Sequence, residues 1–362
     1  MRLEVNGVQY TNFTAASCEL RLDSLSSTFR FDAVAPNGQA LPFKGGEACK
    51  VIVDGVTVLT GFIEVVSVDY NGSDHTISVS GRDKTADLLD STIDDIDDIR
   101  GDGLTLKALI EKVIEQLGLD IQVIDEVEPE PYNAAEDIAA PEPGDNAFQF
   151  IEKYAKKRQV LLTSNGDGNI VIATNSGQTA EGAVQHIIGA EDNNVIASSF
   201  SYDTTGRYNA YKIASGLNPV ALNLAGDTDL ASLVNQGGGV FDSDIRAGRQ
   251  LIIISEAPFS DGPCEDRAKW EADIRRARGL VYSATVPAFR VDGDQGDLWQ
   301  INRIYQIVDD FVGKIEPMLC NSVTFTFDVD NGRNTNLGFV GQKAYTLFIE
   351  PDPLAEVADN VA

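Results

Sequence analysis

Residues 65–93 read VVSVDYNGSDHTISVSGRDKTADLLDSTI, and this stretch is the most informative about the fold of the chain. Apolar and polar side chains alternate over 66–70 and again over 77–79, and Asn71-Gly72 lies between the two runs. A period of two indicates strands with one buried face, and Asn-Gly supplies the positive φ angles of a tight turn. The stretch therefore predicts a β-hairpin that ends in the polar segment GRDKT.

Composition and charge restrict the class of protein. At 362 residues the chain exceeds one ordinary core, so two or three domains are expected, and its 43% hydrophobic residues are enough to bury them. Asp and Glu number 56 against 28 Lys and Arg, which gives a formal net charge of −28. The acidic residues 346–362 are expected to be a loosely held tail. A net charge of −28 repels nucleic-acid backbones, so specific nucleic-acid binding is not expected.

The cysteines and the N-terminal residues bear on the compartment. Cys18, Cys49, Cys264 and Cys320 form no CxxC pair and have no histidine at metal-ligand spacing. They are expected to be buried apolar residues in a reducing compartment. The first ten residues already alternate like a strand, and no apolar run approaches the roughly 20 residues of a membrane helix. Synthesis in a cytoplasm and no stable membrane insertion are expected.

The N-terminal part reads as nearly all β. Over residues 1–93, short alternating runs are separated by turn signals such as Pro36-Asn37-Gly38. Their spacing predicts a small antiparallel β-barrel.

The period then becomes helical. Apolar residues recur at i, i+3 and i+4 from Leu106 to Leu117, with Asp102 or Thr105 as candidate N-caps and Gly118 placed to end the helix. An acidic, proline-rich loop is expected over residues 126–143.

A second helix and a hairpin complete this region. The helix is expected after the candidate N-cap Asp145, and the hairpin has strands at 160–162 and 170–172. Residues 94–190 are therefore expected to form a small α/β domain.

The remainder returns to β patterning. Residues 191–345 are expected to form a second β-barrel with a loop and helix insertion around 222–280. That insertion includes a glycine-rich loop at 237–239 and a helix over about 264–278. Residues 251–254 are apolar throughout, which predicts a strand covered on both sides.

A weak internal repeat connects the two β regions. The sequence VIVDG at 51–55 is echoed by QIVDD at 306–310, and a hairpin arm follows each, at 67–69 and 322–324. Identity is too low to prove a repeat from sequence alone.

The sequence shows no recognisable motif for catalysis or for binding a cofactor or metal ion. His75 and His186 have no nucleophile or orienting acid at a recognisable spacing, so each is expected to be an exposed turn residue. No nucleophile elbow, P-loop or dinucleotide fingerprint appears. The acidic segments 95–100, 165–170 and 292–297 depart from the spacing of an EF-hand loop, although an irregular calcium site stays open. No catalytic residue, no cofactor-binding residue and no metal ligand is therefore assigned, and no enzyme activity is expected.

The strand end VSGRDKTADLLDS after an N-terminal barrel, followed by helix, acidic loop, helix and hairpin, resembles the baseplate hub proteins of Mu-type contractile phage tails. That family is related to the base of type VI secretion spikes, and the resemblance extends to about Tyr345. It implies two small antiparallel β-barrels plus a small α/β domain in each chain, so the expected fold class is mainly β with an α+β insertion.

The resemblance also implies an assembly. Three chains would form a homotrimeric ring, whose six barrels present quasi-sixfold symmetry to the hexameric tail tube while the lower face receives the trimeric tail spike. DNA would pass through the channel, and the tape-measure protein and other baseplate proteins are further expected partners. The expected location is the virion tail baseplate, assembled in the host cytoplasm. If acidic side chains line the channel, they would keep DNA from adhering.

Arg82 and Lys84 are the candidate subunit-interface residues, because they are basic groups next to acidic runs in an acidic chain. The alternative is a solvated turn, and charge reversal at Arg82 would distinguish the two by its effect on assembly.

The alternative function is a tail-associated carbohydrate-binding or cell-wall-degrading component. It requires an aromatic platform or a catalytic acid pair, and the only tryptophans are Trp270, on an expected packing face, and Trp299. An OB-like nucleic-acid-binding barrel is disfavoured by the charge.

Overall fold

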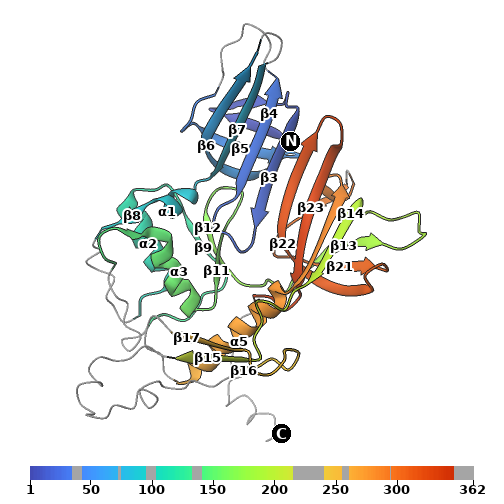
Figure 1. Ribbon diagram of the computed structural model, residues 1–362. Helices are drawn as coiled ribbons and strands as arrows, with labels where there is room; N and C mark the ends of the chain where they lie inside the picture. The colour runs from blue at the N-terminus through green and yellow to red at the C-terminus, as the bar shows by residue number, and fades with distance from the viewer. Residues whose placement is uncertain are drawn as a thin grey trace, which may run out of the picture.

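The computed structural model describes residues 1–34, 43–71, 75–94, 103–132, 141–214, 240–254, 261–293 and 295–345. Most of its strands belong to one 13-stranded sheet (Figure 1). The predicted fold class, mainly β with a smaller part that contains helices, is confirmed. The predicted turn at Pro36-Asn37-Gly38, the acidic segment 95–100, the loop at 237–239 and the tail 346–362 lie outside the described residues. The predicted domain boundaries stay predictions.

The first half of the sheet is antiparallel throughout, in the order β3-β4-β7-β6-β5-β1-β2. Its strands are β1 (Arg2–Val5), β2 (Val8–Tyr10), β3 (Ala15–Arg21), β4 (Thr28–Val34), β5 (Ala48–Val53), β6 (Val56–Tyr70) and β7 (His75–Asp83). The predicted hairpin is formed by β6 and β7, which pair from Gly61↔Asp83 to Tyr70↔His75.

A small α/β unit follows, with its own core. Its elements are α1 (Ala86–Asp90), β8 (Thr92–Ile93), α2 (Leu106–Leu117), β9 (Val123–Asp125), β10 (Asp145–Asn146), α3 (Ala147–Lys157), β11 (Leu161–Ser164) and β12 (Ile170–Ala173). The apolar face predicted for α2 is buried, and Leu109 and Val113 pack with Ile151 of α3 in one cluster. Burial of these faces stabilises the unit by roughly 1.5–3 kcal/mol per large side chain.

The helix caps of this unit match the sequence in one case and differ in the other. In α2, the Thr105 side chain accepts a hydrogen bond from the Ala108 amide, and Gly118 ends the helix with a left-handed φ of 65°. In α3 the cap is Asn146 and not the predicted Asp145. The reason is that Asn146 Oδ1 accepts a hydrogen bond of 3.0 Å from the Gln149 amide in the first turn, whereas the Asp145 carboxylate accepts from the Glu142 amide before the helix.

The second half of the sheet has the order β14-β18-β23-β22, with β21 on the other edge of β22 and β13 beside β21. The strands are β13 (Thr179–His186), β14 (Ala197–Tyr202), β18 (Leu280–Pro287), β21 (Ile304–Asp309), β22 (Lys314–Asp328) and β23 (Gly332–Gly341). The strands β19 (Arg290–Asp292) and β20 (Gln295–Leu298) form a separate two-stranded sheet.

The predicted insertion forms a small three-stranded sheet of its own in the order β16-β15-β17. It contains β15 (Ala210–Ala214), β16 (Val240–Phe241), β17 (Gln250–Ile254) and the helix α5 (Asp261–Arg278), which begins before the predicted residue 264. The prediction that residues 251–254 are covered on both sides is wrong, since Ile252 is 57% exposed. Its neighbours Leu251 and Ile253 pack with Ala268 and Ala272 of α5, so the helix covers one face of this sheet.

The two halves are not two separate closed barrels. Strand β21 pairs with only the first part of β22, and β3 occupies the rest of that edge, from Ser322↔Arg21 to Asp328↔Ala15. This pairing joins both halves into one sheet, and a single hydrophobic cluster includes Phe31 from the first half and Phe325 from the second. Among the described strands, the pairing leaves the sheet open.

The two halves nevertheless repeat one topology. The order β3-β4-β7-β6-β5-β1 matches the order β14-β18-β23-β22-β21-β13, with one difference in direction at the end: β1 pairs antiparallel with β5, whereas β13 pairs parallel with β21. The longest strands, β6 and β22, have 15 residues each, and each has a bulge against the following strand, between Ile63 and Val65 in β6 and between Cys320 and Ser322 in β22. The weak echo between 51–55 and 306–310 therefore falls on the equivalent strands β5 and β21.

Candidate functional site

The GRDKT segment forms a buried polar junction where β7 ends. Asp83 is 1% exposed and accepts hydrogen bonds from Ser26 Oγ at 3.0 Å, the Ser27 amide at 2.8 Å, the Thr85 amide at 3.1 Å, Thr85 Oγ1 at 2.6 Å and Ser164 Oγ. The donors come from the loop before β4, the residue before α1 and the end of β11. One carboxylate therefore joins the sheet to the α/β unit.

The turn of the β11–β12 hairpin packs against the same half of the sheet. Thr60 Oγ1 of β6 donates a hydrogen bond of 2.8 Å to the Gly166 carbonyl. A Cβ atom on Gly166 would lie 2.4 Å from the Thr57 carbonyl oxygen, so only glycine permits this approach. The predicted glycine turn is thus a contact between the sheet and the α/β unit.

Arg82 and Lys84, the predicted subunit-interface residues, lie on either side of the buried carboxylate and make contacts within the chain. Arg82 pairs with Glu64 at 2.6 Å and with Asp90, and the hydrogen bonds that it donates to these two carboxylates raise the pKa of Arg82. Lys84 Nζ donates to the Asp120 carbonyl at 3.0 Å. The side chains are 28% and 21% exposed, and a role toward a second subunit stays a prediction.

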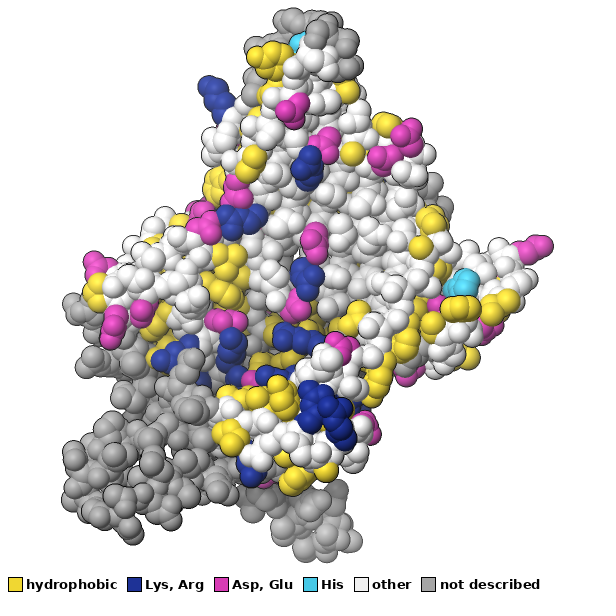
Figure 2. Space-filling view, viewed as in Figure 1, with side chains coloured by type: hydrophobic (Ala, Val, Ile, Leu, Met, Phe, Trp, Pro, Cys, Tyr) yellow, Lys and Arg dark blue, Asp and Glu magenta, His cyan; other side chains and the backbone are white. Residues whose placement is uncertain are grey.

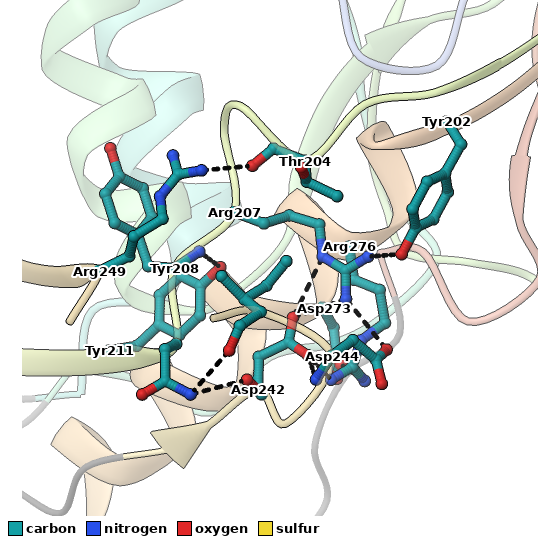
Figure 3. A network of polar contacts seen from close by, with 12 residues as sticks. Tyr202, Thr204, Arg207, Tyr208, Tyr211, Asp242, Asp244, Arg249, Asp273 and Arg276 are labelled. Carbon is teal, nitrogen blue, oxygen red and sulfur yellow. Dashed lines mark hydrogen bonds and ion pairs between the residues drawn. The ribbon is translucent and has the colours of Figure 1, made fainter. Parts of the chain in front are cut away.

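A second polar junction holds the inserted sheet against α5 (Figure 3). The Arg207 side chain is 2% exposed and donates to Asp242 at 3.1 and 2.8 Å, to the Tyr202 hydroxyl at 2.8 Å and to Asp244 at 3.2 Å. Arg276 of α5 reaches the other oxygen of Asp242 at 3.3 Å. Burial alone would raise the pKa of Asp242, but the bonds from Arg207 and the charge of Arg276 hold it below its ordinary value.

A third junction lies where β13, β18 and β21 meet. The buried Asp309 accepts hydrogen bonds from the Tyr282 hydroxyl at 2.8 Å and Ser198 Oγ at 3.2 Å, and His186 Nδ1 lies 3.3 Å away. Burial alone would raise the pKa of Asp309, but the bonds from Tyr282 and His186 hold it below its ordinary value. The hydroxyl of Ser198 contacts the carboxylate and not the imidazole, which is not the arrangement of a nucleophile with its base.

The environment of His186 differs from the expected exposed turn. Parallel pairing of β13 with β21 places His186 opposite Asp309, and its side chain is 35% exposed. This pairing joins segments more than a hundred residues apart, so local sequence gave no sign of it.

Other residues considered from the sequence are mostly buried. Cys18, Cys49 and Cys320 are buried free thiols, and burial raises the pKa of Cys49 to about 12, whereas the side chain of Cys264 lies outside the described residues. Trp270 and Trp299 are 6% and 2% exposed, so neither forms a surface platform for a glycan. In the described part of the chain, no three His, Cys, Asp or Glu side chains are grouped to hold a metal ion. No helix among those residues is long and apolar enough to cross a membrane.

Two family models match the N-terminal part of the chain. Residues 1–83 match the Mu phage baseplate assembly protein GpP-like family, N-terminal domain, and residues 85–174 match the second domain of the baseplate hub protein gp44-like family. The two matches adjoin at the junction around Asp83.

Relatives match nearly the whole chain. The baseplate hub protein gp44 of Escherichia phage Mu is 23% identical over 355 residues, which cover 97% of this chain and 90% of that protein. The crystal structure of the 43 kDa tail protein of prophage MuSo2 from Shewanella oneidensis is 28% identical, with a TM-score of 0.79 over 96% of this chain and 99% of that one. The tail protein from Neisseria meningitidis MC58 is 18% identical, with a TM-score of 0.78 over 95% and 96% of the two chains, and shares the fold.

The fold and these matches define a structural protein of the phage tail, a component of the virion. Within that class, the chain belongs to the baseplate hub proteins of Mu-like phages.

Proposed function

We propose that three copies of this chain form a ring that adapts the threefold tail spike to the hexameric tail tube and leaves a channel for DNA ejection. The observation that carries the proposal is the repeated antiparallel order within one chain, β3-β4-β7-β6-β5 in the first half and β14-β18-β23-β22-β21 in the second. Three chains with two equivalent halves each provide six similar units around one axis. A closed ring of this kind follows the rule that homo-oligomers adopt point-group symmetry.

The exposed face of the sheet would line the channel, since its other face packs on the hydrophobic core. Strand β7 presents Ser78 and Ser80 on this face, and β22 presents Thr324 and Thr326. The face of the sheet turned to the viewer in Figure 2 is mostly uncharged, with a few acidic and basic side chains next to one another. One such pair is Arg30 with Asp32, at 3.0 Å.

This face does not support the expectation of an acidic channel wall. Its hydroxyl groups and paired charges would present a nearly neutral surface to DNA, to which a polyanion has no strong electrostatic attraction. In this account most of the net charge of −28 lies on other surfaces of the chain.

In this proposal the chain has a structural role without catalysis, and its partners are the tail spike protein, the tail tube protein, the tape-measure protein and other baseplate proteins. Assembly would take place in the host cytoplasm. The description of a relative as a baseplate hub protein supports the proposed place of the chain in the tail baseplate.

The molar mass in solution tests the proposal. Light scattering on the purified protein, alone and coexpressed with the spike protein, is expected to give three times 39.0 kDa, about 117 kDa, for the chain itself in at least one condition. A monomer in both conditions would contradict the ring.

A further inference from the structure

Equivalent edges of the two halves differ in whether they have a partner. On one edge of β22, β21 covers residues 314–319 and β3 covers residues 322–328. On the same edge of β6, β5 covers residues 56–62. Among the described strands, none pairs with the rest of that edge, residues 65–70.

Strand β14, the equivalent of β3, has the complementary free edge. It pairs with β18 on one side, and it ends the sheet among the described strands. Figure 1 shows β14 and β6 on opposite sides of the sheet, with β3 and β22 between them.

Side-chain exposure agrees with a missing partner at β6. The bulges align Val65 with Ser322, and this alignment makes Val68 equivalent to Phe325. Phe325, next to β3, is 0% exposed, whereas Val68 is 42% exposed and Tyr70 is 76% exposed. An exposed apolar edge of this kind is a template for pairing with another chain.

We propose that residues 65–70 of β6 pair antiparallel with β14 of a second copy of this chain, in the register that β22 and β3 use within the chain. This inference rests on the proposed ring and specifies its subunit contact. Pairing β14 of each chain with β6 of the next would make the strands from β14 to β6 continuous around the ring, and neither of these two edges would stay unpaired.

The register follows from the pairings within the chain. Phe325 lies opposite Cys18. Gly81 of β7 and Phe339 of β23 are equivalent, since they pair with Ile63 and Cys320 at the two bulges. They pair on their other side with Phe29 of β4 and Tyr282 of β18, which are therefore equivalent too. Because Cys18 pairs with Phe29 and Phe200 pairs with Tyr282, Phe200 is the equivalent of Cys18.

Substituting the equivalent residues gives the contacts between two copies. The residues that lie opposite each other in the two copies are Val66 and Tyr202, Ser67 and Ser201, Val68 and Phe200, Asp69 and Ser199, and Tyr70 and Ser198.

The chemistry of the two edges fits this register. Strand β14, sequence ASSFSY, carries no charge, and the single charged residue of β6 in the contact, Asp69, lies opposite the hydroxyl of Ser199. No like charges oppose each other. The pair Val68 and Phe200 joins a β-branched and an aromatic side chain, which stabilises antiparallel strands by roughly 0.2–1 kcal/mol relative to alanines.

Cysteine cross-linking tests the register. One tagged chain carries Ser67→Cys, a second untagged chain carries Ser201→Cys, and both carry Cys264→Ser, since the other cysteines are buried. Opposed residues in an antiparallel pair have Cβ atoms about 4.5–5.5 Å apart, which a disulfide spans after small adjustment. Mild oxidation of the coexpressed chains should give a covalent dimer of about 78 kDa, twice 39.0 kDa.

The matched control is Ser199→Cys in place of Ser201→Cys. Both serines are exposed on the same face of β14, but residue 199 lies two positions along, roughly 7–8 Å from residue 67 in the proposed register. Its cross-link should be much weaker. A 117 kDa assembly in which the 67–201 link is absent, or no stronger than the 67–199 link, would overturn the register and leave the ring standing. A monomer, with and without the spike protein, would overturn both.

Discussion

Replacing Asp83 by alanine is expected to lower the free energy of unfolding by about 3 kcal/mol or more. The carboxylate is 1% exposed and accepts five hydrogen bonds from three separate segments. Its removal leaves buried donors without an acceptor, and each such group costs roughly 1–3 kcal/mol. Urea unfolding followed by circular dichroism measures the change.

Asp32→Ala is the matched control for Asp83→Ala. Asp32 also belongs to the first half of the sheet, but its side chain is 34% exposed and pairs with Arg30, which is 61% exposed. Pairs of this kind contribute about 0–1 kcal/mol. If the two variants lose similar stability, the junction around Asp83 does not have the structural role assigned to it.

Replacing Asp242 by alanine is the second large change. It leaves the guanidinium of Arg207, 2% exposed, without its main counter-ion, and removing one partner of a buried ion pair costs about 3–5 kcal/mol. The loss should be local to β15, β16, β17 and α5. Hydrogen exchange of the backbone amides in these elements should therefore accelerate strongly, while the amides of β6 and β7 stay protected.

Asp244→Ala provides a control at the same guanidinium. Asp244 lies 3.2 Å from Arg207, but its side chain is 61% exposed, so its loss should cost at most about 1 kcal/mol. Equal acceleration of exchange in the two variants would contradict a special role for the buried pair.

Because the pKa of Asp242 is lower in the folded protein than its ordinary value, the contribution of Asp242 to stability is present above about pH 4 and is lost as the pH falls through the lowered pKa.

Local features of the fold were accessible from sequence. The hairpin of β6 and β7 follows from alternation and an Asn-Gly turn, and α2 follows from its apolar spacing together with Thr105 and Gly118. In both cases the determining contacts lie within a few residues of one another. The cap of α3 was missed by one residue, which is within the ordinary uncertainty of helix ends.

Long-range pairings were not accessible in the same way. The junction of β22 with β3 joins Ser322 to Arg21, and the alternation of either strand fits a closed barrel equally well. The same holds for His186, whose contact with Asp309 depends on the β13–β21 pairing.

Asp83 did leave a signal that the sequence reasoning missed. Along β7 the buried positions are Ile77, Val79, Gly81 and then Asp83, so the carboxylate occupies an inward position of the strand. A charged residue at such a position must have hydrogen-bond partners, and this requirement pointed to Asp83 as the central residue of the GRDKT segment. Its basic neighbours Arg82 and Lys84, which were the predicted site residues, lie at the surface of the junction.

Electron microscopy of the isolated assembly tests the ring most directly. Views along the axis of the purified protein, alone or with the spike protein bound, are expected to show six lobes around a central opening, with alternate lobes related by threefold symmetry. Each chain would contribute two adjacent lobes, because β22 and β3 join its two halves. Particles with no central opening, or with a number of lobes other than six, would contradict the account.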